Sequence, residues 1–142
     1  MSVQSVDGVE RSVHKTNDWL SDLEELLGVN REEAWRILKA FLQVLRDELT
    51  LDEAAQLAAQ LPLVLRGAFY EGFDPSSQPA KLRQRERFLE LLAERARLDG
   101  TGEAQRAAQA AATVLRRHVT EGELDDVLSQ LPSEVREVLV SR

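Results

Sequence analysis

Apolar residues recur every three or four positions along most of this chain, which is the spacing of one face of an α-helix. The first such run consists of Trp19, Leu20, Leu23, Leu26 and Leu27. Thr16 and Asn17 precede it, and both residue types are favoured at helix N-caps. Gly28 follows it, and glycine is common just beyond the C-terminus of a helix. We therefore predict a flexible N-terminal tail over residues 1–15, then a helix that begins near Thr16 or Asn17 and ends at Gly28.

Capping signals mark the next helices. Two pairs of residues have the spacing of a capping box, Asn30 with Glu33 and Thr50 with Glu53, and Thr120 with Glu123 repeats the second cap later in the chain. Pro62 suits the first turn of a further helix, where its missing N–H has little cost. Gly72, followed by Asp-Pro, ends that helix. The sequence up to residue 75 therefore predicts four helices, of which the one after Asn30 has an apolar stripe wide enough for burial on more than one side.

The second half of the chain repeats the first. Eight residues of segment 45–66 have identical partners 70 positions later. They are Leu45, Arg46, Thr50, Glu53, Gln60, Leu61, Pro62 and Arg66, and they match Leu115, Arg116, Thr120, Glu123, Gln130, Leu131, Pro132 and Arg136. This self-similarity indicates a duplicated helical unit. An alanine-rich stretch at 104–112 is expected to pack closely on the helix that follows Asn30, because small side chains allow helices to approach.

These signals together predict an all-α protein. No stretch alternates apolar and polar residues in the way a strand does. We expect about eight helices, arranged as a tandem duplication of a four-helix unit that shares one core. The first repeat spans 16–75, a linker and the start of a basic helix span 76–87, and the second repeat spans 88–142. The whole is expected to form one compact domain.

Composition narrows the class of function. The chain has 142 residues, 43% of them apolar and 30% charged, as in folded soluble proteins. It has no cysteine, so disulfides and thiolate metal sites are excluded. The net charge of −7 resides in residues 1–75, which hold 14 acidic and 7 basic residues. An acidic protein repels a phosphate backbone, which argues against nucleic-acid binding. No apolar run has the roughly 20 residues that a membrane helix needs, so we expect no membrane association.

Residues 60–75 form the most distinctive motif. They read Gln-Leu-Pro-Leu-Val-Leu-Arg-Gly-Ala-Phe-Tyr-Glu-Gly-Phe-Asp-Pro. With Leu45-Arg46, Leu49 and Glu53-Ala54, this motif resembles the bacterial family called domain of unknown function 2267. Phe69 and Phe73 stand where that family has Tyr and Trp. The resemblance covers roughly residues 19–139, and it implies a prokaryotic, cytoplasmic, helical protein without established catalytic residues.

The segment after Pro62 is where the two repeats differ most, so it is the best candidate for a binding site. The candidate residues are Arg66, Phe69, Tyr70, Glu71, Phe73 and Asp74. Polar groups around two phenylalanines would suit a peptide or a partner helix. Gly67 costs a helix about 1 kcal/mol relative to alanine, which suggests that another backbone approaches it closely. The alternative interpretation is that the aromatic residues only pin the linker onto the core.

The shared arginines also have two interpretations. Arg46, Arg66, Arg116 and Arg136 would form a symmetric anion site, or each would bond to carbonyl groups at helix ends or to a nearby glutamate. The sequence leaves both open. In a second hypothesis for function, a pocket between the repeats, lined by Arg46, Arg66, Tyr70 and Glu71, makes the chain a small-ligand-binding module or an enzyme.

A third hypothesis rests on basic residues in segment 81–97. They are Lys81, Arg83, Arg85, Arg87, Arg95 and Arg97. This run would contact nucleic-acid phosphates or an acidic partner. Glutamates interleave with it at four-residue spacing, however, which is typical of a solvated helix face.

The sequence offers little for catalysis. His14 and His118 are isolated, so they form no metal-binding motif. Asp125 and Asp126 are consecutive, and consecutive side chains point in different directions on a helix. We predict no catalytic residues, no bound metal and no cofactor. The favoured function is that of a bacterial, cytoplasmic, non-enzymatic interaction or accessory protein that binds a protein partner or itself.

Overall fold

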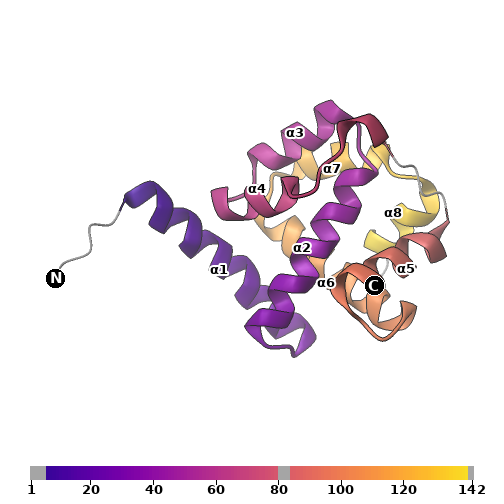
Figure 1. The fold of residues 1–142 in the computed structure, drawn as a ribbon, viewed down its shortest axis with the longest axis horizontal. Coiled ribbons are helices and arrows are strands. Elements are labelled where there is room, and N and C mark those ends of the chain that lie inside the picture. Colours follow the sequence, from indigo (N-terminus) through magenta and orange to yellow (C-terminus); the bar gives the residue numbers. More distant parts are fainter. Residues whose placement is uncertain (1–5, 80–83, 141–142) are drawn as a thin grey trace.

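The computed structural model describes residues 6–79 and 84–140, and within them the chain is entirely helical (Figure 1). The elements are α1 (Asp7–Leu27), α2 (Arg31–Asp47), α3 (Leu51–Ala59), α4 (Leu63–Tyr70), a 3-10 turn (Pro75–Ser77), α5 (Arg85–Ala96), α6 (Thr101–His118), α7 (Glu121–Gln130) and α8 (Ser133–Val140). The prediction of an all-α fold with about eight helices is confirmed. None of these helices combines the length and the apolar character that crossing a bilayer requires.

Helix α2 lies at the centre of the fold. It contacts α1, α4, α5 and α6, while α3 lies against α7. The N-terminal end of α1 extends beyond the other helices (Figure 1). Buried side chains from both sequence repeats form one continuous apolar cluster, which includes Phe41, Phe69 and Phe88. The two halves of the chain therefore share one core.

Helix α1 begins earlier than predicted. It starts at Asp7 instead of near Thr16, so residues 7–15, which we assigned to a flexible tail, are helical. The Thr16 hydroxyl does not cap a helix but donates to the carbonyl of Ser12 at 2.7 Å, and Ser12 donates to Val9 at 2.8 Å. Both side chains are buried. A hydroxyl that bonds back to its own helix is compatible with the helix interior, which is why Thr16 is no boundary.

The predicted helix ends otherwise occur where the caps indicated. Gly28 adopts the left-handed conformation, with φ of 67°, and terminates α1. Asn30 accepts a hydrogen bond from the Glu33 N–H at 2.8 Å at the start of α2. Thr50 and Thr120 are the N-caps of α3 and α7. Short polar side chains thus satisfy N–H groups that have no partner within the helix.

The alanine-rich helix α6 contacts α2, as predicted, but it also contacts α1, α5 and α8. Its buried residues include Ala104, Ala107, Ala110 and Ala112, which do not lie on a single face. Small side chains around α6 therefore allow several helices to approach it, and the prediction of a single packing partner was incomplete.

Arg46 ties three segments together at the end of α2. Its side chain is 2% exposed, and its guanidinium donates to the carbonyls of Phe69 at 2.8 Å and Glu71 at 2.9 Å. It also pairs with Asp47 at 2.8 Å. The Gln78 amide in turn donates to the Arg46 carbonyl at 2.8 Å. One buried cation therefore holds the end of α4 and the segment after it against α2.

Arg46→Ala should lower the free energy of unfolding by about 3 kcal/mol, because the buried Phe69 carbonyl and the partly buried Glu71 carbonyl lose their donor and the removed side chain leaves a cavity. Arg116, the equivalent residue of the second repeat, is exposed. Arg116→Ala should therefore change stability by no more than about 0.5 kcal/mol. Urea unfolding of both variants measures this difference, and equal effects would refute the role given to Arg46.

Candidate functional site

The structure places the sequence-predicted candidate residues along one segment, but most are occupied by contacts within the chain. Phe69 is fully buried. The Arg66 guanidinium donates to the carbonyl of Ala58 at 2.9 Å and to that of Leu61 at 3.1 Å. Arg136 makes the equivalent contacts with Leu128 and Leu131, both at 2.9 Å. Both arginines thus bond to carbonyls at helix ends, as one of the two interpretations expected.

Tyr70 and Glu71 lie at the end of α4. The Tyr70 ring contacts Phe69 edge-on, with centroids 5.3 Å apart, and Phe73 at 5.8 Å. Glu71 pairs with Lys39 on α2 at 2.9 Å. Tyr70 remains 37% exposed, so it presents part of its ring to solvent.

Phe73 and Asp74 organise the turn that follows. Phe73 is half-buried beneath the Arg46 guanidinium, which lies 5.3 Å from the ring centroid. The Asp74 carboxylate accepts hydrogen bonds from Ser76 and Ser77, and these bonds lower its pKa. The aromatic residues therefore do pin the segment after α4 onto the core, and Tyr70 is the aromatic ring with the most exposed surface.

The close approach of another backbone that we predicted at Gly67 is not observed. A Cβ atom placed there would meet no other atom within 4 Å, so no backbone among the described residues approaches it closely. The glycine lies on an exposed side of α4, between Leu63 and Tyr70 at one turn in either direction. Leu63 is 58% exposed. We refer to the exposed residues Leu63, Val64, Gly67 and Tyr70 as the α4 face.

The α4 face continues onto α1. Val64 lies in a shallow hollow that is also lined by Val13, Leu20 and Trp35. Val9 and Val13 of α1 and its N-cap residue Val6 are exposed. Helices α1 and α4 thus present neighbouring apolar side chains to solvent.

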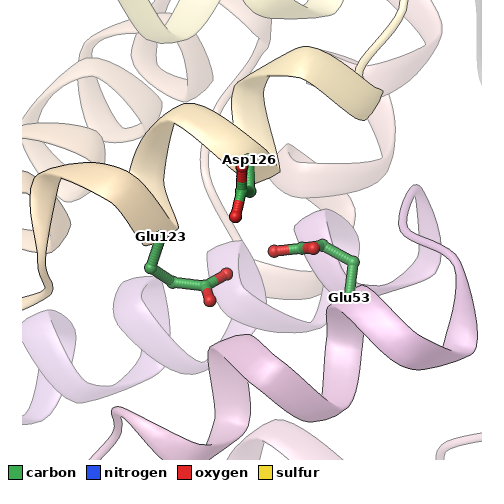
Figure 2. Close-up of side chains that lie close together, drawn as sticks. All are labelled: Glu53, Glu123 and Asp126. Carbon is green, nitrogen blue, oxygen red and sulfur yellow. The ribbon is translucent and has the colours of Figure 1, made fainter.

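A second arrangement was not predicted. Glu53 on α3 and Glu123 and Asp126 on α7 each point a carboxylate into one gap between the two helices (Figure 2). One oxygen from each lies within 4.8 Å of the other two. We call these three residues the acidic cluster.

The acidic cluster forms because two glutamines accept the backbone N–H bonds that two glutamates would otherwise accept. The Gln130 side-chain oxygen accepts from the Thr50 N–H at 3.1 Å, and the Gln60 oxygen accepts from the Thr120 N–H at 2.8 Å. Each glutamine therefore caps a helix of the other sequence repeat. In a complete capping box, the glutamate three residues after the cap would accept these N–H bonds.

Only half of each predicted capping box forms. The Thr50 hydroxyl accepts from the Glu53 N–H, and Thr120 accepts from the Glu123 N–H, both at 3.3 Å. The glutamate side chains do not reach back, because a glutamine occupies the position. Instead they turn inwards toward each other (Figure 2).

The two glutamates are buried without full compensation. Glu53 is 6% exposed and Glu123 is 8% exposed. Glu53 Oε1 and Glu123 Oε2 have no hydrogen-bond partner in the described part of the chain. The ion pairs found among residues 6–79 and 84–140 include none of the three carboxylates. Two ionised carboxylates no more than 4.8 Å apart would repel by at least roughly 3.5 kcal/mol at an effective dielectric constant near 20.

This environment favours the neutral form of one carboxyl group. Burial, a hydrogen bond with Glu53 and the charges of Glu53 and Asp126 together raise the pKa of Glu123 to about 8. Asp126 is exposed, so the cluster is open to solvent on its side.

Sequence reasoning missed the acidic cluster because it assigned Glu53 and Glu123 to local caps and treated Asp126 only as the neighbour of Asp125. A signal was present. Glu123 and Asp126 are three residues apart, which places them on the same side of a helix, and Glu53 is the repeat partner of Glu123. What the sequence lacked was the contact that brings α3 against α7.

Several of the remaining candidates have structural partners. His118 bonds to Asp22 at 2.8 Å and stacks on Trp19 with ring centroids 4.8 Å apart. In the basic run, Arg87 pairs with Glu90 at 2.7 Å and Arg95 lies 3.6 Å from Asp47. Lys81 and Arg83 lie outside the described residues.

The raised pKa of Glu123 predicts that stability falls as pH rises. The folded state holds the proton to about pH 8, whereas the unfolded chain releases it near pH 4.5. The stabilisation is therefore complete below pH 4.5 and is lost between pH 4.5 and 8, by at most about 1.4 kcal/mol per pH unit. Glu123→Gln should flatten this slope and be more stable than wild type at pH 8.

Urea unfolding in chelator-treated buffer from pH 4.5 to 8.5 measures both slopes. Glu121→Gln, an exposed glutamate in the first turn of the same helix, is the matched control. Parallel pH profiles for wild type and Glu123→Gln would contradict the assignment.

Comparison with known proteins places these features in a family. The model of the family described as "Uncharacterized conserved protein (DUF2267)" matches residues 16–138. No curated protein matches the chain. The matched range contains the α4 face, the Gln-Leu-Pro sequences at 60–62 and 130–132, and the acidic cluster. It extends over most of the sequence. This chain therefore belongs to the DUF2267 family.

Proposed function

We propose that this chain is a non-enzymatic interaction module that binds a protein partner through the α4 face. The observation that carries the proposal is an exposed glycine inside a helix, flanked by exposed apolar residues. Gly67 lies in the middle of α4, and Leu63 and Tyr70 lie one turn before and after it.

Gly67 makes α4 less stable than alanine would, and no contact among the described residues offsets this loss. Glycine in a helix interior is about 1 kcal/mol less favourable than alanine. A Cβ at this position would meet no atom, so packing within the chain does not require its absence. A partner that lies directly on the backbone of α4 would require that Gly67 have no Cβ. Leu63 and Tyr70 would then contact that partner on either side.

Charge indicates the kind of partner. The first 75 residues, which contain the α4 face, carry 14 acidic and 7 basic residues, and so account for the whole net charge of −7. This charge disfavours a second copy of the chain and favours a basic partner. We infer an amphipathic helix with basic residues, because a helix can lay an apolar stripe along α4 and the adjoining valines of α1. The proposed setting is the bacterial cytoplasm, which the family resemblance implied.

The contacts of the arginines give less support to a small-ligand site. Our second hypothesis placed such a site in a pocket between the repeats, lined by Arg46, Arg66, Tyr70 and Glu71. The guanidinium groups of Arg46 and Arg66 are bonded to backbone carbonyls. A ligand anion would have to displace these bonds.

Gly67→Ala should have opposite effects on folding and on binding. The variant should be more stable than wild type by up to about 1 kcal/mol, because alanine favours the helix and there is room for its methyl group. Its affinity for the partner should fall at least about tenfold, since the methyl group prevents close approach. Thermal unfolding measures the first effect. Affinity capture, followed by titration of the purified partner, measures the second.

Gly122→Ala provides the matched control. Gly122 is also an exposed helical glycine with open space around it, but it lies on α7. It should leave binding unchanged, whereas Tyr70→Ala should weaken it. Sedimentation velocity separates a foreign partner from self-association. Equal binding by wild type, Gly67→Ala and Tyr70→Ala would exclude the α4 face.

A further inference from the structure

The acidic cluster lies on α3 and α7, apart from the α4 face, and it has a chemistry of its own. We propose that Glu53, Glu123 and Asp126 together bind one hard divalent cation, with Ca²⁺ the best fit, and that this cation links α3 to α7. The proposal goes beyond partner binding and does not depend on it.

The first argument concerns unused ligand atoms. Glu53 and Glu123 are more than nine-tenths buried, and each has one carboxylate oxygen without a hydrogen-bond partner among the described residues. Their side chains point into the same gap from opposite helices (Figure 2). Buried polar atoms are nearly always satisfied, so two orphaned oxygens that face one gap indicate a ligand between them.

The second argument concerns how the side chains came to be free. Both glutamates occupy the third position of a helix whose cap N–H is already bonded to a glutamine of the other repeat. A capping-box glutamate normally finds its partner on its own helix. Here that N–H is bonded to a glutamine twice, once at each helix, so neither glutamate caps its own helix and each keeps one oxygen without a hydrogen-bond partner among the described residues.

The third argument concerns the donor set. All three groups supply anionic oxygen, which suits hard cations and does not suit metals that prefer nitrogen or sulfur. The ligand atoms lie within 4.8 Å of one another. Ca²⁺ binds oxygen at about 2.3–2.6 Å, so two of its ligands can lie up to about 5 Å apart. Mg²⁺ binds at about 2.0–2.1 Å, which limits two of its ligands to about 4.2 Å apart.

Access completes the site. Asp126 is exposed, whereas the two glutamates are buried. A cation can therefore enter from the Asp126 side and keep water molecules there, as oxygen-liganded cations with few protein ligands do. Because the ligands come from both sequence repeats, the cation would join the two halves of the chain.

The test is a calorimetric titration of the full chain, stripped with a chelator, at one fixed pH. Ca²⁺, Mn²⁺ and Mg²⁺ are each added alone. Wild type should bind one equivalent of Ca²⁺ and bind Mg²⁺ more weakly. At a free Ca²⁺ concentration about 100 times the measured Kd, the Tm should rise by roughly 5–10 °C.

Variants separate the proposed site from general attraction to an acidic protein. Asp126→Asn should weaken Ca²⁺ binding at least about tenfold, and because Asp126 is exposed, the variant should keep its fold. Glu53→Gln and Glu123→Gln should weaken it further. Asp125→Asn removes the same charge from the neighbouring exposed residue and should bind as wild type does.

Three results would overturn the proposal in whole or in part. Wild type without a saturable Ca²⁺ signal at millimolar concentration would show that the carboxyl groups form only a proton-sharing pair. Equal loss of affinity in Asp125→Asn and Asp126→Asn would show diffuse attraction to negative charge. A preference for Mg²⁺ over Ca²⁺ would overturn the choice of Ca²⁺.

Discussion

The helix caps that α3 and α7 receive from each other's repeat are the interaction on which the rest of this structure depends. Gln60 bonds to Thr120 and Gln130 bonds to Thr50, so each start of a helix is completed by a residue from the other half of the chain. Neither helix start has its full set of partners within its own repeat. This gives a physical reason for the two halves to form one structure around a common core.

The same exchange of caps creates the acidic cluster. A glutamine that bonds across the repeats takes the position that a glutamate on the same helix would otherwise fill. Two buried carboxylates are then left facing each other. Burying these groups carries a desolvation cost that an apolar contact at the same place would not have. Repeated residues thus generate a pair of groups that no single repeat contains.

Equivalent residues need not have equivalent roles, and the first of the two repeats carries an additional structure. Arg46 is buried under the segment that follows α4, whereas Arg116 is exposed at the end of α6. The difference follows from Phe69, Phe73 and the turn beyond them, which bring backbone carbonyls over Arg46. Arg66 and Arg136, by contrast, bond to carbonyls at the same kind of helix corner.

Local rules were enough for the helices, because periodicity, caps and breakers act within a few residues. The sequence by itself determined the all-α class, the caps at Asn30, Thr50 and Thr120, and the end of α1 at Gly28. The tertiary structure alone decided which residues meet. It showed that Gly67 is open to solvent, that the Glu53 and Glu123 side chains do not accept the cap N–H bonds, and that Asp126 lies beside them. The positions of the three carboxylates depend on contacts between residues 60 and 80 positions apart, and a side chain's local pattern does not say which distant group will compete for its partner.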